Sequence, residues 1–337
     1  MKNCFYVRIL GKKRLRTVGC AITYRCNAEC PMCSAKLLMG NRKNKAAKEL
    51  STDEILALWK EAVKLGAVHI NLTGGEPTLR NPDEIVTIIK GIVREGAFIS
   101  MVTNGVSLLR EDLARYAEAG LDTLQLSMES LDEKTHDTAR NLPGNHKKIM
   151  RAFRWAKELR LNICLSVVLT AENFSEVKRI IEFAKQQKVF ALLNPISSSG
   201  AKAGNADNSI ADKKKEYYQL LKLGRVRADT MLNFRGAIGC PAGVERLYIT
   251  PYAEVMTCPH VQISYGNIRK EPLKRIYKRI SNFPFLKNFE RDCRHVFNKD
   301  YIERMMQPIY GIPDLPVSIY RHPVAKEKEI RRYLEKA

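Results

Sequence analysis

Two features common in membrane and secreted proteins are missing from this 337-residue sequence. No apolar run approaches the roughly 20 residues that a membrane-spanning helix needs. Residues 1–16 mix basic side chains with short apolar pieces and lack the continuous apolar stretch of a secretory signal. We therefore expect a cytoplasmic protein without a transmembrane segment.

A disulfide framework and internal repeats are missing as well. The nine cysteines are an odd number, and the chain is far longer than the small secreted domains that depend on disulfides. No repeat suggests a solenoid. With 45% hydrophobic and 28% charged residues, the composition is that of an ordinary globular protein. Thiolates that bind metal in a reducing compartment fit this cysteine content better than cross-links do.

Acidic residues are scarce relative to basic ones. The 36 Asp and Glu residues against 57 Lys and Arg give a formal net charge of +21. This excess indicates an anionic partner, such as a phosphorylated substrate, a nucleic acid or peripheral contact with an acidic lipid surface. The alternative is a solvated basic surface. The basic residues are dispersed, and no aromatic-interleaved RNA-binding pattern stands out.

Three cysteines stand close together at Cys26, Cys30 and Cys33, in the spacing C-x3-C-x2-C. Three thiolates on one loop can converge on a [4Fe-4S] cluster, which then keeps one iron without a protein ligand. Ferredoxin cysteine runs supply four ligands at other spacings, so this is not the pattern of an electron carrier. Half of a zinc site and unrelated core thiols are the alternatives.

Six apolar segments alternate with helical patterns along the first 195 residues. We predict strands over 18–23, 68–72, 98–102, 123–128, 163–169 and 189–193. Helices are predicted over 51–65, 83–95, 110–119, 147–159 and 175–187. This order predicts parallel strands with right-handed crossovers, in a barrel-like or open sheet. Polar motifs accompany the ends of the first four strands, so the carboxyl edge of the sheet should gather them around one site.

The cysteine spacing, with Met32 before the last cysteine, resembles the signature of the radical S-adenosylmethionine (SAM) superfamily. The resemblance covers about residues 20–195 and implies a partial (β/α)6 TIM-like barrel in an α/β fold. It implies that Cys26, Cys30 and Cys33 bind a [4Fe-4S] cluster whose open iron is chelated by SAM. Reductive cleavage of SAM in this family gives a 5′-deoxyadenosyl radical.

Two further motifs carry the resemblance. Gly74, Gly75, Glu76 and Pro77 follow the second strand and resemble the GGEP motif, which in the family binds the amino group of SAM. Asn104, in Thr-Asn-Gly, matches the family's pattern after the third strand. Each stretch alone is also consistent with a plain turn.

The remaining SAM contacts are implied at later positions. Ser127 stands where relatives bond the ribose hydroxyls, and Glu129 replaces the Asp that many of them carry. Arg140, in an H-D-x-x-R stretch, would face the methionine carboxylate of SAM, with a surface ion pair as the alternative. Val168 and Asn194 are the nearest candidates for holding adenine.

A second group of cysteines lies beyond the core at Cys240, Cys258 and Cys293. Residues 249–259 resemble the hairpin of SPASM and twitch extensions, which hold auxiliary iron–sulfur clusters; where these commonly have Gly, this chain has Ala253. The resemblance implies a second cluster in a small C-terminal α+β domain. Buried structural thiols are the alternative. His260 and His295 are each either a fourth ligand or a surface residue.

We divide the chain into five parts. These are a basic lead-in (1–16), the barrel core (17–196), a linker and helix (197–236), an auxiliary-cluster domain (237–300) and a C-terminal tail (301–337). Cys4, Cys20 and Cys164 have no partner pattern and are assigned to core packing.

The resemblance implies an enzyme that abstracts hydrogen from a substrate C–H bond. Its cofactors would be SAM, a [4Fe-4S] cluster and a second iron–sulfur cluster, and its reductant a small flavodoxin- or ferredoxin-type protein. The substrate is either a peptide or a small molecule, and the short segment before the core slightly favours a small or anionic one. The competing hypothesis is a non-catalytic iron–sulfur or zinc protein for electron transfer or binding.

Overall fold

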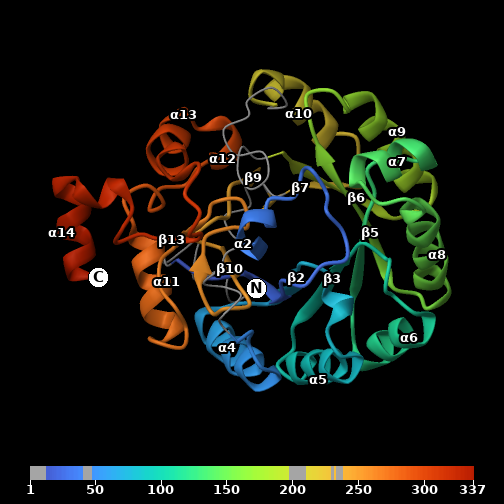
Figure 1. Cartoon of the computed structure of the whole chain (residues 1–337), viewed down its shortest axis with the longest axis horizontal. Coiled ribbons are helices and arrows are strands. Elements are labelled where there is room, and N and C mark those ends of the chain that lie inside the picture. Colours follow the sequence, from blue (N-terminus) through green and yellow to red (C-terminus); the bar gives the residue numbers. More distant parts are fainter. Residues whose placement is uncertain (1–12, 41–47, 197–209, 229–230, 233–237) are drawn as a thin grey trace.

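A computed structural model describes residues 13–40, 48–196, 210–228, 231–232 and 238–337 (Figure 1). The predicted partial barrel is confirmed, with six parallel strands in sequence order: β1 (Thr17–Thr23), β2 (His69–Gly74), β3 (Phe98–Thr103), β4 (Thr123–Ser127), β5 (Asn162–Leu169) and β6 (Phe190–Pro195). The predictions for residues 1–12 of the lead-in, Cys4 among them, and for residues 197–209 of the linker lie outside the described residues.

Helices cover the outer face of the curled sheet (Figure 1). They are α4 (Thr52–Leu65), α5 (Pro82–Val93), α6 (Arg110–Ala119), α7 (Glu133–Arg140), α8 (Asn145–Glu158), α9 (Phe174–Gln186) and α10 (Lys214–Leu221). Helix α4 shows how local sequence sets these bounds. Ser51 and Glu54 form a capping box at its start, and Gly66 ends it in the left-handed conformation, with φ of 109°. Its buried residues, Ile55 and Leu58 among them, face the sheet core.

Three strands from later in the chain extend this sheet, one at one end and two at the other. The strand order is β11-β10-β1-β2-β3-β4-β5-β6-β7, in which β7 (Val226–Ala228) pairs with β6, and β10 (Arg246–Ile249) pairs with β1, both in parallel. Strand β11 (Val255–Met256) then returns antiparallel to β10 as the predicted hairpin. The C-terminal region is therefore joined to the barrel by backbone hydrogen bonds.

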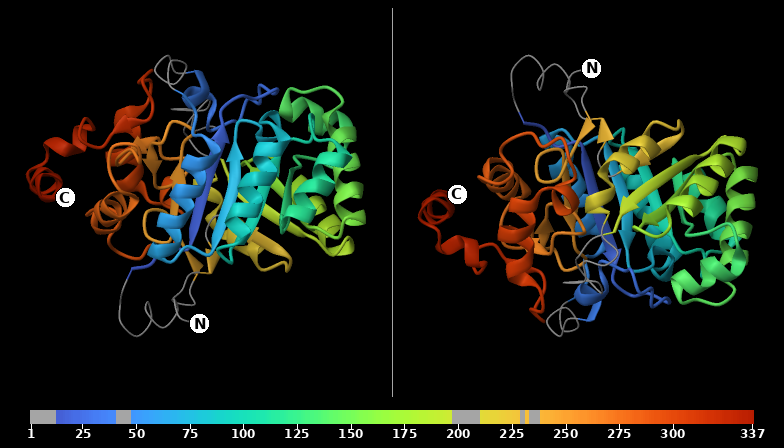
Figure 2. Two further views of the ribbon diagram at one scale, coloured as in Figure 1. Left: turned by 90° about the horizontal axis from the view of Figure 1, so that it is seen from below. Right: turned by 90° about the horizontal axis from the view of Figure 1, so that it is seen from above.

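The C-terminal region packs beside the β1 end of the sheet, and helix α11 (Leu273–Asn282) contacts α4 (Figure 2). It also contains β12 (Ile263–Ser264), β13 (Val317–Ser318), α12 (Arg294–Phe297), α13 (Lys299–Tyr301) and α14 (Lys328–Lys336). Short β8 (Met231–Leu232) and β9 (Ile238–Gly239) form a separate pair. Within the described ranges, no helix has the length and apolar content needed to cross a bilayer.

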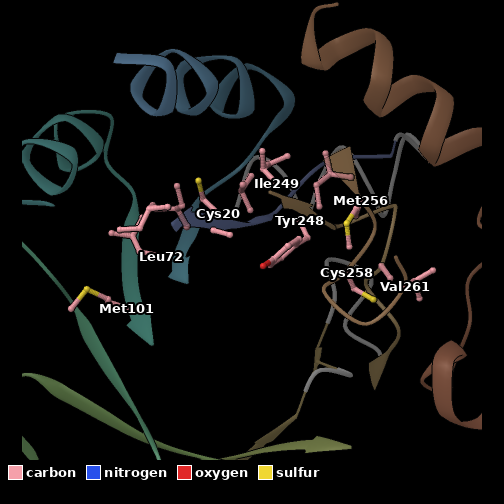
Figure 3. Close-up of a cluster of buried hydrophobic side chains, with 14 of the residues drawn as sticks. Cys20, Leu72, Met101, Tyr248, Ile249, Met256, Cys258 and Val261 are labelled. Atoms are coloured by element: carbon pink, nitrogen blue, oxygen red, sulfur yellow. The ribbon is translucent and has the colours of Figure 1, made fainter. Parts of the chain in front are cut away.

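One hydrophobic core runs from the barrel into the C-terminal region. Leu72 and Met101 of the barrel belong to the same buried cluster as Met256 and Cys258 of the extension (Figure 3). Cys20 and Cys164 are buried too, and burial raises the pKa of each thiol to about 12. These two thiols therefore stay protonated, as packing residues would.

Candidate active site

The three cysteines of the first motif lie on the loop between β1 and the short helix α2 (Lys36–Gly40). Cys26 is exposed, Cys30 is buried and Cys33 is half-buried. The pKa of the Cys26 thiol is raised to about 11, mainly by desolvation and to a smaller extent by the charges of Glu76, Cys33 and Cys30, while a hydrogen bond from the backbone of Ala28 opposes the rise. Cys33 N donates to Cys30 O at 3.1 Å, so the loop turns between these two cysteines, and a cation bound by the thiolates would offset their mutual repulsion.

The glycine pair of Gly74 and Gly75 allows the turn after β2 to lie against this loop. Gly75 N donates to Thr23 O at 2.8 Å, and Glu76 N donates to Arg25 O at 2.8 Å. A Cβ atom would stand 2.0 Å from Thr23 O at Gly74 and 2.3 Å from Arg25 O at Gly75. Gly74 also has a φ of 143°, which L side chains rarely adopt. These positions therefore require glycine to bring two backbone segments together.

The carboxylate of Glu76 is buried and saturated by donors from this chain. It accepts hydrogen bonds from Thr78 N and Oγ1, from Thr103 Oγ1 at 2.7 Å and from Asn104 N at 2.7 Å. Burial raises its pKa, and the hydrogen bonds oppose that shift. Glu76 thus ties the end of β2 to the end of β3. Its predicted contact with SAM stays a prediction.

Asn104 connects the cysteine loop to the helices behind it. Its Nδ2 donates to Asn27 Oδ1 at 2.8 Å, and its backbone oxygen accepts from Asn145 Nδ2 at 2.7 Å. His136 Nε2 lies 2.9 Å from Asn145 Oδ1, while His136 Nδ1 accepts from Glu129 N at 3.2 Å. A buried chain of hydrogen bonds therefore links the ends of β3 and β4 through His136 and Asn145.

The sequence-based assignment missed these supporting residues. It used the H-D-x-x-R stretch only for Arg140, although His136 is fully buried and Asp137 accepts from the backbone of Gly144 and His146. Burial lowers the pKa of His136 to about 4, so its ring is neutral at pH 7. The motif itself was the signal for His136 and Asp137. No pattern marked Asn145, which is an ordinary residue at a helix start.

Arg140 makes a buried ion pair and not a surface one. Its Nη1 donates to Glu129 Oε1 at 3.2 Å, and the two side chains are only 12% and 4% exposed. The other carboxylate oxygen of Glu129 accepts from Val168 N at 2.9 Å. Arg140 also lies close enough to Cys30 and Cys33 to lower the pKa of both thiols against the larger effect of burial. The Nε of Arg140 is buried and has no hydrogen-bond partner within the described part of the chain.

A cavity of about 570 Å³ opens from this loop into the barrel. Residues that the sequence singled out line it: Cys30, Cys33, Gly74, Arg140, Val168 and Asn194. Others lie outside its lining: Cys26, Gly75, Glu76, Pro77, Asn104 and Ser127. Ser127 is buried at the end of β4. The structure therefore separates residues that face the cavity from residues that support its rim.

The cysteines of the C-terminal region are grouped around histidine and tyrosine side chains. Cys293 Sγ lies 3.2 Å from His295 Nδ1, and the His295 ring stacks on His260 with centroids 4.4 Å apart. The charges of Cys258 and Cys240 both raise the pKa of Tyr301, after the larger effect of burial. Cys240 and Cys258 are thus near one tyrosine, and Cys293 is near the histidine that stacks on His260.

Two details of this region bear on its likeness to a cluster-binding hairpin. Ala253, where relatives commonly have Gly, is buried and has a φ of 70°, the left-handed conformation that glycine adopts without strain. Pro259 and His260, which follow the hairpin, line the central cavity, and Gln262 Nε2 donates to Ser34 O at 2.6 Å, so this segment lies beside the first cysteine loop. Among the described residues, no three His, Cys, Asp or Glu side chains are arranged to hold a single metal ion.

The three thiols of the first loop fit an iron–sulfur cluster, and Arg140 nearby fits SAM. Its three thiols can supply three corners of a [4Fe-4S] cluster, whose ligands are spaced more widely than those of one ion. The buried, unpartnered Nε of Arg140 lies at the same end of the cavity, where a ligand carboxylate would satisfy it.

Comparison with known proteins agrees with this geometry. The family model described as the radical SAM superfamily matches residues 20–184. A "PqqA peptide cyclase" of Rhizobium meliloti (strain 1021) is 26% identical over 276 residues, which cover 76% of this chain and 72% of the relative. The enzyme of the same name from Rhodopseudomonas palustris is 32% identical over 163 residues, 48% of this chain and 42% of that relative.

Solved structures share the fold at low sequence identity. Streptococcus suis SuiB bound to the precursor peptide SuiA has a TM-score of 0.62 at 14% identity and covers 79% of this chain and 65% of SuiB. The enzyme anSMEcpe with bound AdoMet has a TM-score of 0.58 at 17% identity and covers 84% of this chain and 91% of anSMEcpe. At these sequence identities, the structural similarity establishes the fold alone.

Proposed function

The chain belongs to the radical SAM superfamily, and from this premise we propose that it modifies a peptide. When bound, a [4Fe-4S] cluster with an open iron supplies the reductive cleavage of SAM that generates a hydrogen-abstracting radical. The protein's own contribution is to bind, orient and shield, because a dry site prevents side reactions of a radical. A small flavodoxin- or ferredoxin-type protein is proposed as the electron donor.

We assign Cys26, Cys30 and Cys33 as the cluster ligands. Arg140, Val168 and Asn194 would contact SAM from the cavity wall, together with the backbone of Gly74. Gly75, Glu76, Pro77, Asn104 and Ser127 would act at the rim, where Glu76 and Asn104 fix the turn and the loop relative to each other. Arg140 suits the methionine carboxylate because its guanidinium combines full charge with an unused donor.

A second cluster in the C-terminal region is part of this proposal. Its ligands would be Cys240, Cys258 and Cys293, with His260 or His295 near the remaining corner. The position of Pro259 and His260 on the cavity wall supports a role in the reaction, since a cluster held there would lie beside the substrate space. We keep residues 237–300 as the auxiliary-cluster region.

The similarity to PqqA peptide cyclase carries the choice of a peptide over a small molecule. It covers 76% of this chain, which is more than the barrel core of residues 17–196 alone could supply. The fold of SuiB, whose structure holds a precursor peptide, supports the same choice. The described sheet ends at β7 on one side and at β11 on the other.

Anaerobic turnover tests this proposal. The reconstituted protein would be incubated with SAM, dithionite and a synthetic PqqA-type peptide, and the products followed by mass spectrometry. We expect 5′-deoxyadenosine together with a peptide that has lost hydrogen. Formation of 5′-deoxyadenosine that no peptide accelerates would argue against peptide modification, and its absence from a fully iron-loaded protein would overturn the radical reaction itself.

A further inference from the structure

The inner wall of the barrel carries amide side chains that face the central cavity. Four of them line it, one each from β2, β4, β5 and β6: Asn71, Gln125, Asn162 and Asn194. Alternate residues of a strand face the same side of a sheet, so Gln125 faces the cavity while Leu124 and Leu126 are fully buried on the other face of β4. Each amide offers both hydrogen-bond donors and an acceptor.

Three of the four amides are bonded to other groups of the barrel wall. The bonds run from Ser100 Oγ to Asn71 Oδ1 at 2.9 Å, from Asn162 Nδ2 to Asp122 O at 3.0 Å and from Asn194 Nδ2 to Ser166 Oγ at 2.8 Å. Gln125 differs from them, because its side chain makes no hydrogen bond within the part of the chain that the structure describes. Both its donor and its acceptor are therefore available to a molecule in the cavity.

The neighbours of Gln125 in the sheet supply no strong partner for it. Parallel pairing places Val102 of β3 on one side of Gln125 and Cys164 of β5 on the other. The Val102 side chain has no polar atom, and a thiol such as that of Cys164 is only a weak donor and acceptor. A ligand that displaces water from this place must therefore bond to the amide itself, since burial of an amide without partners is costly.

The depth of Gln125 in the barrel separates it from the SAM site. It lies two residues before Ser127 on the same strand, so their Cα atoms are roughly 7 Å apart at the usual rise per residue. Ser127, which we assign to the rim of the SAM site, is at the carboxyl end of β4 together with the cysteine loop. Gln125 therefore lies below SAM, where the substrate has to enter the cavity.

We propose that Gln125 binds an amide of the peptide substrate through two hydrogen bonds, with Nε2 as donor and Oε1 as acceptor. The inference rests on the proposed function and deepens it. The N–H and C=O of one extended residue point to the same side, so the backbone can form both bonds at once. A carboxylate offers no donor for Oε1. The side-chain amide of a substrate Asn or Gln has the same chemistry, and the experiment separates the two sources.

Peptides that the enzyme uses provide the probe. A random decapeptide library would be screened for members that accelerate 5′-deoxyadenosine formation by the iron-loaded protein with SAM and dithionite. Their affinities for the SAM-bound protein would then be measured by anaerobic fluorescence anisotropy. We expect about ten-fold weaker binding in Q125M, which keeps the length of the side chain without its hydrogen-bonding groups. The control Q219M, with the same change at an exposed position outside the lining, should differ less than about two-fold.

Replacement of each backbone amide of the peptide by an ester locates the contact. The ester that removes the N–H bonded to Gln125 should weaken binding to wild type about three-fold or more but leave binding to Q125M unchanged. A misfolded variant would fail this comparison. The same pattern on change of a peptide Asn or Gln to Leu would assign the contact to a side-chain amide. Equal losses in both proteins for every peptide change, or weaker SAM binding in Q125M by calorimetry, would overturn the site.

The outcomes also separate this inference from the proposed function. Peptide binding and modification that Q125M leaves unchanged would refute the role of Gln125 and leave peptide modification in place. If no library peptide accelerates 5′-deoxyadenosine formation, the peptide substrate and this inference both fall. SAM cleavage without peptide, measured separately, reports on the radical SAM reaction alone.

Discussion

The buried pair of Arg140 and Glu129 offers the sharpest test of how the active site is held together. Replacement of Arg140 by Met keeps the bulk of the side chain but removes its charge. The carboxylate of Glu129, only 4% exposed, is then left with one hydrogen bond, from Val168 N at 2.9 Å. A buried carboxylate in that state is costly because water cannot replace the lost cation.

The magnitude follows from this burial. Removal of one partner of a buried ion pair typically destabilises a protein by about 3–5 kcal/mol, so we expect that loss for R140M near pH 7. In R140M/E129Q no charge remains buried, and the double variant should lie within about 1–2 kcal/mol of wild type. SAM affinity should instead fall about ten- to a hundred-fold in both, since neither carries the guanidinium.

The pH dependence of R140M has a defined sign. Burial already raises the pKa of Glu129 above its usual value of 4.5, and Arg140 opposes that rise. Without Arg140 the folded-state pKa rises further, so the folded protein holds this proton more tightly than the unfolded chain does. The variant therefore approaches wild-type stability as the pH falls through that pKa, and loses stability as the pH rises through it.

Urea unfolding of the iron-free proteins, followed by circular dichroism at pH 7.5 and 5.5, measures these differences. Calorimetry on the reconstituted proteins gives the SAM affinities. A loss below about 1 kcal/mol in R140M would refute the buried-pair argument. Full SAM affinity in R140M/E129Q would instead show that Arg140 supports the site without contacting SAM.

Four further outcomes are expected. Changing Cys26, Cys30 and Cys33 together to Ala should remove about four irons per chain and abolish 5′-deoxyadenosine formation, and continued cleavage would disprove the ligand assignment. The corresponding change at Cys240, Cys258 and Cys293 should leave about four of eight irons and SAM cleavage in place but stop peptide modification; an unchanged iron count would exclude a second cluster there. Gly75→Ala should impair folding or SAM binding because its Cβ would meet Arg25 O at 2.3 Å, and a fully active variant would contradict this tight contact. Asn145→Ala should lower the free energy of unfolding by about 1–3 kcal/mol, because it leaves His136 and the Asn104 carbonyl without their hydrogen-bond partner. An unchanged free energy of unfolding would show that water replaces the amide.

Most of the barrel could be predicted because its signals are local. The apolar segments, the capping box of Ser51 and Glu54 and the Gly66 terminator act over a few residues, and the strands they delimit are those observed. The gathering of motifs at the carboxyl edge followed from parallel pairing of consecutive strands. The positions of Cys30, Cys33, Gly74 and Arg140 around one cavity agree with that expectation.

Several features of the site had no local signal. Glu76 carries a recognisable motif, yet its four donors come from two different strand ends. From the sequence alone, Arg140 could be a surface residue or a ligand contact. The structure adds a third role, a buried ion pair with Glu129. Asn145 completes a hydrogen-bond chain that only the packing of α7 and α8 against β3 and β4 creates.

The sequence by itself determined the cysteine spacing, the glycine turn and the alternation of strands and helices, because each depends on chemistry within a few residues. Tertiary structure decided that β10 joins the barrel beside β1, and that Asn71, Gln125 and Asn194 face one cavity although they lie on three separate strands. Pairing between strands more than 200 residues apart, as for Thr17 and Arg246, depends on the register of the whole sheet. Side chains distant in sequence therefore acquire a common function only once that register is fixed.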